Sequence, residues 1–156
     1  FKNLSVKEWS AEIPFLYTFT LGISDGKEIY QYIKRPVGFK HIKINGNVFT
    51  FNNKAIKLLG VNHHDTSAHN GYAMTPYEME RDVRIFKEYN VNCVRTSHYP
   101  PDPLFLDLCD EYGVYVVDEA DIETHGCEVE MHKPGIVSGN HIWQSRYLDR
   151  VMRMPH

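Results

Sequence analysis

Three short clusters of polar side chains are candidates for chemistry, because each directly follows an apolar run. They occupy residues 62–65, 95–99 and 118–125, and together they contain imidazole, guanidinium, hydroxyl and carboxylate groups. Imidazoles and hydroxyls hydrogen-bond polyhydroxylated ligands, and a guanidinium pairs with a carboxylate. The clusters therefore predict a binding or catalytic site, provided that the fold brings them together.

The apolar runs that precede the clusters are expected to be β-strands. They span residues 56–61, 92–96 and 114–117. The last is a continuous Val-Tyr-Val-Val run, which suits a strand buried on both faces of a parallel sheet. The carboxyl ends of parallel strands meet at one edge of the sheet, where the functional side chains of βα folds gather. Three strands that bring histidines and carboxylates to one edge are more than folding stability requires.

The first helix is expected to begin after Thr75. Residues 75–78 (Thr-Pro-Tyr-Glu) form a capping box with proline at the first helical position, where its missing N–H costs nothing. Met79, Val83 and Phe86 follow at the spacing of one helix face, so they are expected to point into the core.

The second helix is expected to run from residues 102–103 (Asp-Pro) to a C-cap at Gly113, with Leu104 and Leu108 on one face. A long loop over residues 119–141 then precedes a last helix at 143–154. Strands that alternate with helices of this length argue for a parallel βα architecture. Three parallel strands fit either a small open sheet or the first part of an eight-stranded barrel.

Short antiparallel strands are expected before the βα units. Alternating apolar residues and the Asp-Gly and Asn-Gly turns are typical of hairpins. The expected strands span residues 16–23, 28–33, 40–44 and 48–51.

Composition excludes some functions. The 156 residues carry a formal net charge of −3 with scattered Lys and Arg, so nucleic acid and anionic membrane surfaces are poor partners. No signal-peptide pattern and no apolar run long enough to cross a bilayer is present. Cys93, Cys109 and Cys127 are an odd set without metal-type spacing, which suggests reduced thiols in the cytoplasm. The first two lie in apolar contexts and are expected to be buried.

Each candidate residue also has a plainer interpretation. His63 and His64 could be surface histidines of a loop, and His98 could brace the turn before two prolines. Arg95 could form an interior salt bridge, and Asp118 and Glu119 could pair inside the rim of the sheet. Glu123 and His125 could be solvated loop residues. The sequence pattern alone leaves these interpretations open.

Three motifs resemble glycoside hydrolase family 2. Asn92-Cys-Val-Arg-Thr-Ser-His98-Tyr-Pro100, with Phe105-Leu106, Asp110 and residues 113–117, is similar to the first signature of that family. Gly60-Val-Asn-His-His-Asp65 resembles the Gly-Val-Asn-Arg-His-Glu stretch of its β-galactosidases, with departures at His63 and Asp65. Ile122-Glu-Thr-His-Gly126 resembles a segment of the large bacterial β-galactosidases that the family's β-glucuronidases usually lack. Residues 9–17 resemble the immunoglobulin-like domain that precedes the catalytic barrel in this family.

The resemblance implies a fold of the α/β class. The family has an eight-stranded (β/α)8 TIM barrel behind an immunoglobulin-like β-sandwich. On this basis residues 1–39 are expected to be the last strands of the sandwich, and residues 40–156 the first three βα units of the barrel.

The resemblance also implies a function, the hydrolysis of terminal β-galactosides with retention. That chemistry uses two carboxyl groups, one as the nucleophile and one as the acid/base. By position in the motifs, His64 and His98 match residues that contact the galactosyl hydroxyls, and Arg95 matches the residue that orients the nucleophile. Glu123 and His125 match two ligands of an active-site Mg²⁺, which the chain alone is expected to bind weakly or not at all. The Asn-Glu pair that carries the family's acid/base does not occur in the 156 residues, so the chain alone is expected to be inactive.

Two alternatives remain. The chain could be a non-catalytic carbohydrate-binding module or the complementing piece of a split β-galactosidase, and the whole protein is expected to form a homo-oligomer or a two-chain assembly. It could instead be an unrelated metal hydrolase built on His63, His64, His98 and His125. The second alternative is weaker, because no two histidines have the His-x-x-x-His spacing of a helical zinc site.

Overall fold

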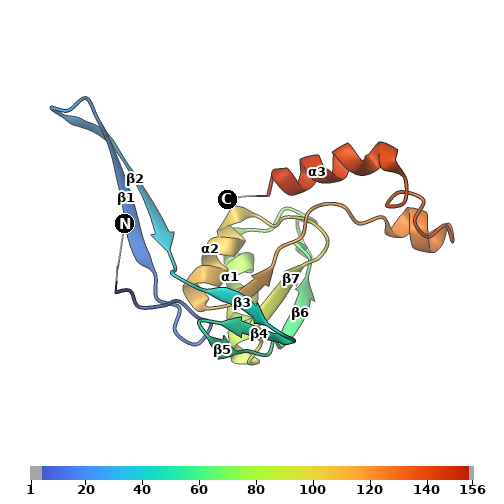
Figure 1. Cartoon of the computed structure of the whole chain (residues 1–156), viewed down its shortest axis with the longest axis horizontal. Helices are drawn as coiled ribbons and strands as arrows, with labels where there is room; N and C mark the ends of the chain where they lie inside the picture. Colours follow the sequence, from blue (N-terminus) through green and yellow to red (C-terminus); the bar gives the residue numbers. More distant parts are fainter. Residues whose placement is uncertain (1–4, 155–156) are drawn as a thin grey trace.

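The computed structural model, which describes residues 5–154, centres on a three-stranded parallel sheet. Its strands, in spatial order, are β6 (Gly60–His63), β7 (Cys93–Thr96) and β8 (Tyr115–Val117). Helices α1 (Pro76–Glu88) and α2 (Pro103–Tyr112) pack against each other, and both contribute to the core beside the sheet (Figure 1). The predicted parallel βα architecture is confirmed.

The pleat of the sheet separates its two faces. Val94 and Val116 are register partners, and they pack in the core with α1 and α2. The next pair, Arg95 and Val117, points to the other face. Val117 is 44% exposed, so the prediction that strand 114–117 is buried on both faces is wrong at this residue. The reason is that the second face borders an open cavity.

Helix α1 confirms the predicted capping box. The side chain of Thr75 accepts the backbone N–H of Glu78, and the Glu78 carboxylate accepts the backbone N–H of Thr75 at 2.8 Å. A hydrogen bond from the Ser67 hydroxyl is the main cause that lowers the pKa of Glu78 to about 2. The three residues predicted to face the core are buried, namely Met79, Val83 and Phe86.

Helix α2 begins and ends as predicted but buries a different face. Phe105 and Cys109 are in the core, whereas Leu104 is 36% exposed and Leu108 only packs against the cluster from its edge. Apolar residues occupy several neighbouring positions of this helix, so more than one face was compatible with the spacing. The largest of these side chains, Phe105, takes the buried position. Gly113 ends the helix with a φ of 78°, a conformation that favours glycine.

Strand β6 begins later than predicted. Residues 56–59 belong to no strand, and pairing starts at Gly60, opposite Cys93. The side chain of Asn92 explains this boundary. It accepts the backbone N–H of Leu59 at 2.8 Å and donates to the carbonyl of Lys57 at 3.0 Å. A side chain therefore satisfies backbone groups that a strand partner would otherwise satisfy.

The predicted hairpins are also present. Strands β1 (Tyr17–Ser24) and β2 (Ile29–Val37) form a long antiparallel hairpin that projects from the rest of the chain (Figure 1). Strands β3 (Ile42–Asn45), β4 (Val48–Phe51) and β5 (Lys54–Ala55) form a small antiparallel sheet. β2 continues past its predicted end, and Pro36 pairs in register with Thr18 of β1. A proline is tolerated there because, among the described residues, β2 pairs with β1 alone and its other edge needs no N–H donor.

Trp9 anchors the N-terminal segment to the βα units. Its side chain is 3% exposed, and its ring lies against Phe51 and Tyr115 with centroid distances of 5.8 and 5.7 Å. The indole N–H donates to the carbonyl of Asp110 at 2.8 Å. Lys87 adds a second connection, because its ammonium donates to the carbonyls of Ala11 and Gly113.

The segment after β8 is less regular. A π-helical turn at Gly126–Glu130 interrupts the predicted loop, and a 3₁₀ turn at His141–Trp143 leads into α3 (Gln144–Met152). The first four residues of the predicted domain 1–39 and the last two residues of the predicted domain 40–156 lie outside the described range. No helix within residues 5–154 is long and apolar enough to cross a membrane. Cys93 and Cys109 are buried, as predicted.

Candidate active site

The polar clusters that follow β6, β7 and β8 meet at one edge of the parallel sheet. The clusters after β7 and β8 border a cavity of about 820 Å³, which Arg95, His98, Glu119 and Glu123 line together with apolar side chains that include Val117 and Val151. The peptide bond between Ser97 and His98 is cis. The structure thus brings together residues that are far apart in the sequence, as expected for the carboxyl ends of parallel strands.

Arg95 and Glu119 form the charged centre of this edge. The Nε of Arg95 donates to the Glu119 carboxylate, and its Nη2 lies 3.1 Å from Nδ1 of His98. The other carboxylate oxygen of Glu119 lies 3.3 Å from the same His98 nitrogen. The hydrogen bond from Arg95 is the main cause that lowers the pKa of Glu119. The carboxylate is therefore ionised at neutral pH, and the pair is lost only when the pH falls through that lowered pKa.

Thr96 connects the ends of β7 and β8. Its hydroxyl donates to the Asp118 carboxylate at 3.1 Å and accepts the backbone N–H of Glu119 at 2.9 Å. Thr96 is 2% exposed. It fixes the backbone from which Glu119 reaches Arg95. This role was not predicted from the sequence, although a threonine at the end of a buried strand was a usable signal.

His64 lies on the same side of the sheet edge as His98. The two rings are in edge contact with a centroid distance of 5.5 Å. The hydroxyl of Tyr99 lies 3.4 Å from Nδ1 of His64. His64 and His98, the two predicted sugar contacts, therefore lie side by side. No role for Tyr99 was predicted from the sequence.

His63 points the opposite way. Its ring stacks on Phe105 with a centroid distance of 4.5 Å, and its Nε2 lies 3.2 Å from a carboxylate oxygen of Asp82 on α1. The side chain is only 9% exposed, so the interpretation of His63 as a surface loop residue is wrong. His63 belongs to strand β6, and the pleat turns it toward the helices, while its exposed neighbour His64 lies against His98. A metal site that uses both histidines is incompatible with this arrangement.

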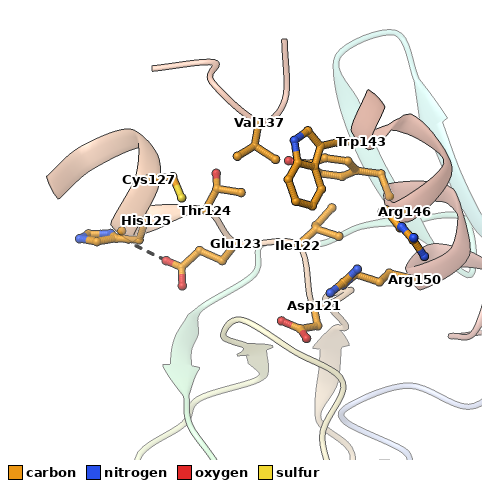
Figure 2. A pocket seen from close by; sticks show the side chains of 12 residues that line it. Asp121, Ile122, Glu123, Thr124, His125, Cys127, Val137, Trp143, Arg146 and Arg150 are labelled. Atoms are coloured by element: carbon orange, nitrogen blue, oxygen red, sulfur yellow. Dashed lines mark ion pairs between the residues drawn. The ribbon is translucent and has the colours of Figure 1, made fainter. Parts of the chain in front are cut away.

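Glu123 and His125 lie on the loop after β8. One Glu123 oxygen is 3.4 Å from Nε2 of His98 and 3.8 Å from Nδ1 of His125. Figure 2 shows the Glu123 and His125 side chains turned toward each other at a second cavity of about 400 Å³, which Ile122, Trp143 and other residues line.

The fit of this pair to Mg²⁺ is partial. One carboxylate oxygen and one imidazole nitrogen are close enough to serve one ion, and Mg²⁺ commonly keeps several water ligands. Within residues 5–154, however, no group of three or more His, Cys, Asp or Glu side chains could hold a metal ion. The described residues therefore offer two adjacent ligands rather than a complete cage.

Models of two parts of one family match the chain. Residues 1–40 match the model "Glycosyl hydrolases family 2", and residues 42–156 match "Glycosyl hydrolases family 2, TIM barrel domain". The two matches meet near the predicted boundary between residues 39 and 40.

Similar proteins include curated β-galactosidases. The enzyme of Streptococcus thermophilus is 38% identical over 160 residues, and the match covers 98% of this chain and 15% of that protein. The enzyme of Leuconostoc mesenteroides is 44% identical over 118 residues, with 76% of this chain and 11% of that protein covered. The chain thus spans about 15% or less of the length of these relatives.

Solved structures of similar fold include β-glucuronidases. The enzyme of Ruminococcus gnavus superposes with a TM-score of 0.70 at 27% identity, covering 73% of this chain and 20% of that chain. The enzyme of Parabacteroides merdae superposes with a TM-score of 0.65 at 32% identity, covering 70% of this chain and 14% of that chain. The match of residues 42–156 extends over most of the sequence. The chain therefore belongs to glycosyl hydrolase family 2, and it includes a region of the family's TIM-barrel domain.

Proposed function

We propose that the chain supplies the sugar-binding side of the active site of a retaining β-galactosidase. The observation that carries the proposal is the convergence of His64, His98 and Arg95 on one sheet edge, where His98 and Arg95 line the cavity and His64 lies against His98. Two imidazoles that face open space can hydrogen-bond sugar hydroxyls, and such bonds contribute most when they tighten as charge develops in the transition state. Family membership supports glycoside hydrolysis as the reaction.

The catalytic carboxyl pair lies outside the proposed role of this chain. A glycosidase acid needs a raised pKa, whereas the pKa of Glu119 is lowered by Arg95. Glu119 therefore suits an ion-pair role and not that of the general acid. In this proposal Arg95 also orients the nucleophile of the whole enzyme, to which its guanidinium presents further N–H donors.

Galactose is preferred over glucuronic acid for two reasons. The curated relatives named above are β-galactosidases, at higher identity than the β-glucuronidase structures. The second reason is the charge of the cavity. Arg95 is the one Lys or Arg that lines it within residues 5–154, and Glu119 already pairs with this guanidinium. Because the nucleophile takes the remaining N–H donors of Arg95 in this proposal, a uronic carboxylate would find no unpaired cation among the described residues that line the cavity.

The finer fold assignment is part of the same proposal. The order β6-β7-β8 with α1 and α2 on one side fits the first three strands of a (β/α)8 barrel, whose interior would then be the face that bears Arg95. The β1–β2 hairpin fits the last strands of an immunoglobulin-like sandwich. A cytoplasmic location and assembly into a homo-oligomer or a two-chain enzyme stay predictions.

The first test compares two proteins. One is this 156-residue chain, and the other is a polypeptide from the same source that contains it and reaches the length of its relatives, called the long polypeptide below. With 4-nitrophenyl β-galactoside, the long polypeptide is expected to release nitrophenol and the chain alone to stay at background, because the chain has no residue matching the family's nucleophile. Turnover by the chain that survives repurification and disappears in His98→Ala would refute this division of roles.

The non-catalytic alternative makes a different prediction for the same chain. A carbohydrate-binding module would show saturable galactose binding in titration calorimetry without turnover by either protein. A complementing piece would restore activity to a long polypeptide that lacks residues 5–154. Neither result is expected under the proposal.

We also propose that Glu123 and His125 are protein ligands of Mg²⁺, with the remaining positions filled by water and by groups outside this chain. Bound Mg²⁺ would stabilise negative charge near the sugar. Glu123→Gln in the long polypeptide is expected to abolish stimulation of activity by added Mg²⁺ after chelation, because the carboxylate supplies the charged ligand. Glu130→Gln, which changes an exposed glutamate after the same loop, is the matched control. An unchanged magnesium response in Glu123→Gln would refute the assignment.

A further inference from the structure

Tyr99 lies between two parts of the candidate site that the proposed function treats separately. It follows His98 in the sequence, and its half-buried ring lies at a centroid distance of 6.0 Å from the ring of His64. Its hydroxyl reaches the loop after β6, on which His64 and Asp65 are neighbours. The phenol therefore links the ends of β6 and β7.

The loop that carries His64 is held from both sides. The backbone N–H of Asp65 donates to the Tyr99 hydroxyl oxygen at 3.2 Å. The backbone N–H of Asp102 donates to the Asp65 carboxylate at 3.3 Å. Asp102 is the N-cap of α2, where its own carboxylate accepts the N–H of Leu104. Asp65, whose N–H contacts the Tyr99 oxygen, is thus itself held by the start of α2.

These bonds leave the phenol proton of Tyr99 available to donate to another group. A backbone N–H can only donate, so the Tyr99 oxygen is an acceptor toward Asp65. The phenol proton is kept at neutral pH, because burial is the main cause that raises the pKa of Tyr99. Its partner is Nδ1 of His64 at 3.4 Å. If the O–H donates to Nδ1, that nitrogen is an acceptor, and a neutral His64 carries its proton on Nε2.

We infer that Tyr99 is a positioning residue, which holds His64 with its proton on Nε2 so that this nitrogen donates a hydrogen bond to a substrate oxygen. The inference rests on the proposed function for the identity of the substrate, a galactoside. The arrangement of the protons concerns this chain alone. A tyrosine that only packs at the sheet edge would impose no such tautomer.

The direct test is nuclear magnetic resonance of the chain with ¹⁵N-labelled histidine. Long-range ¹H–¹⁵N spectra at neutral pH are expected to show His64 protonated on Nε2, with Nδ1 shifted as in a ring nitrogen that accepts a hydrogen bond. In Tyr99→Phe the Nδ1 signal is expected to move to the position of a ring nitrogen without that bond. Tyr77→Phe, which changes a tyrosine of α1 that is 74% exposed, is expected to leave it in place.

Two outcomes would overturn the inference. One is a His64 proton on Nδ1 in the unsubstituted chain, and the other is an unchanged His64 spectrum in a folded Tyr99→Phe chain. Backbone amide spectra report whether the variant folds. If the variant does not fold, the position of the His64 proton in the unsubstituted chain decides the test, since that measurement needs no variant.

A kinetic test separates positioning from packing. In the long polypeptide, Tyr99→Phe is expected to lower kcat/KM for a β-galactoside roughly threefold to tenfold, mainly through kcat. In a His64→Ala background the same substitution is expected to cost nothing further, because it acts through that imidazole. An equal loss in both backgrounds would refute the inference. A long polypeptide that hydrolyses no galactoside would refute the proposed function instead, while the spectra would still test the proton position.

Discussion

Replacing His98 with alanine in the long polypeptide is expected to lower kcat/KM for a β-galactoside on the order of 100-fold. The imidazole takes part in several contacts at once. Arg95 and Glu119 both reach its Nδ1, and Glu123 lies 3.4 Å from its Nε2. His98→Ala therefore removes a proposed sugar contact and also a shared partner of two carboxylates.

The loss is expected mainly in kcat, because a bond to a sugar hydroxyl that tightens in the transition state contributes little to ground-state binding. The measurement is steady-state kinetics with 4-nitrophenyl β-galactoside, with thermal unfolding as the check on folding. His41→Ala, which removes an exposed imidazole next to β3, is the control and should keep full activity. A His98→Ala enzyme with the kinetics of the control would remove His98 from the site.

The strongest element predictions came from local backbone chemistry. The capping box at Thr75, the C-cap at Gly113 and the hairpin turns each set a boundary through interactions between near neighbours. The errors have a different origin. The start of β6 depends on Asn92, which is more than thirty residues away in the sequence, and the buried face of α2 depends on which side chain fills the core. Such long-range contacts leave no periodic signal.

The candidate site shows the same division. Parallel strands bring their carboxyl ends together whatever their side chains, so the meeting of His64, His98 and Arg95 followed from the strand order. The face of the sheet on which the His63 side chain lies did not follow from the strand order. The strand was predicted to end two residues too early, which placed His63 in a loop and not in the pleat. The links made by Thr96 and Tyr99 depend on donor directions, which a residue pattern does not contain.

The second large effect concerns the substrate. The long polypeptide is expected to prefer a β-galactoside over the matching β-glucuronide on the order of 100-fold or more in kcat/KM. The reason is that Arg95, the one Lys or Arg among the described residues that line the cavity, pairs with Glu119, so a uronic carboxylate would lie near the Glu119 anion without an unpaired cation. An enzyme for uronic acids would need an unpaired cation at this place. Residues outside this chain complete the site, so the comparison also tests whether the described half decides specificity.

The most direct measurement is therefore kcat/KM of the long polypeptide for 4-nitrophenyl β-galactoside and for 4-nitrophenyl β-glucuronide under the same conditions. Efficient hydrolysis of the galactoside, with the glucuronide slower on the order of 100-fold or more, is the result expected if His64, His98 and Arg95 belong to a galactose site. A preference for the glucuronide, or no hydrolysis of the galactoside, would contradict it.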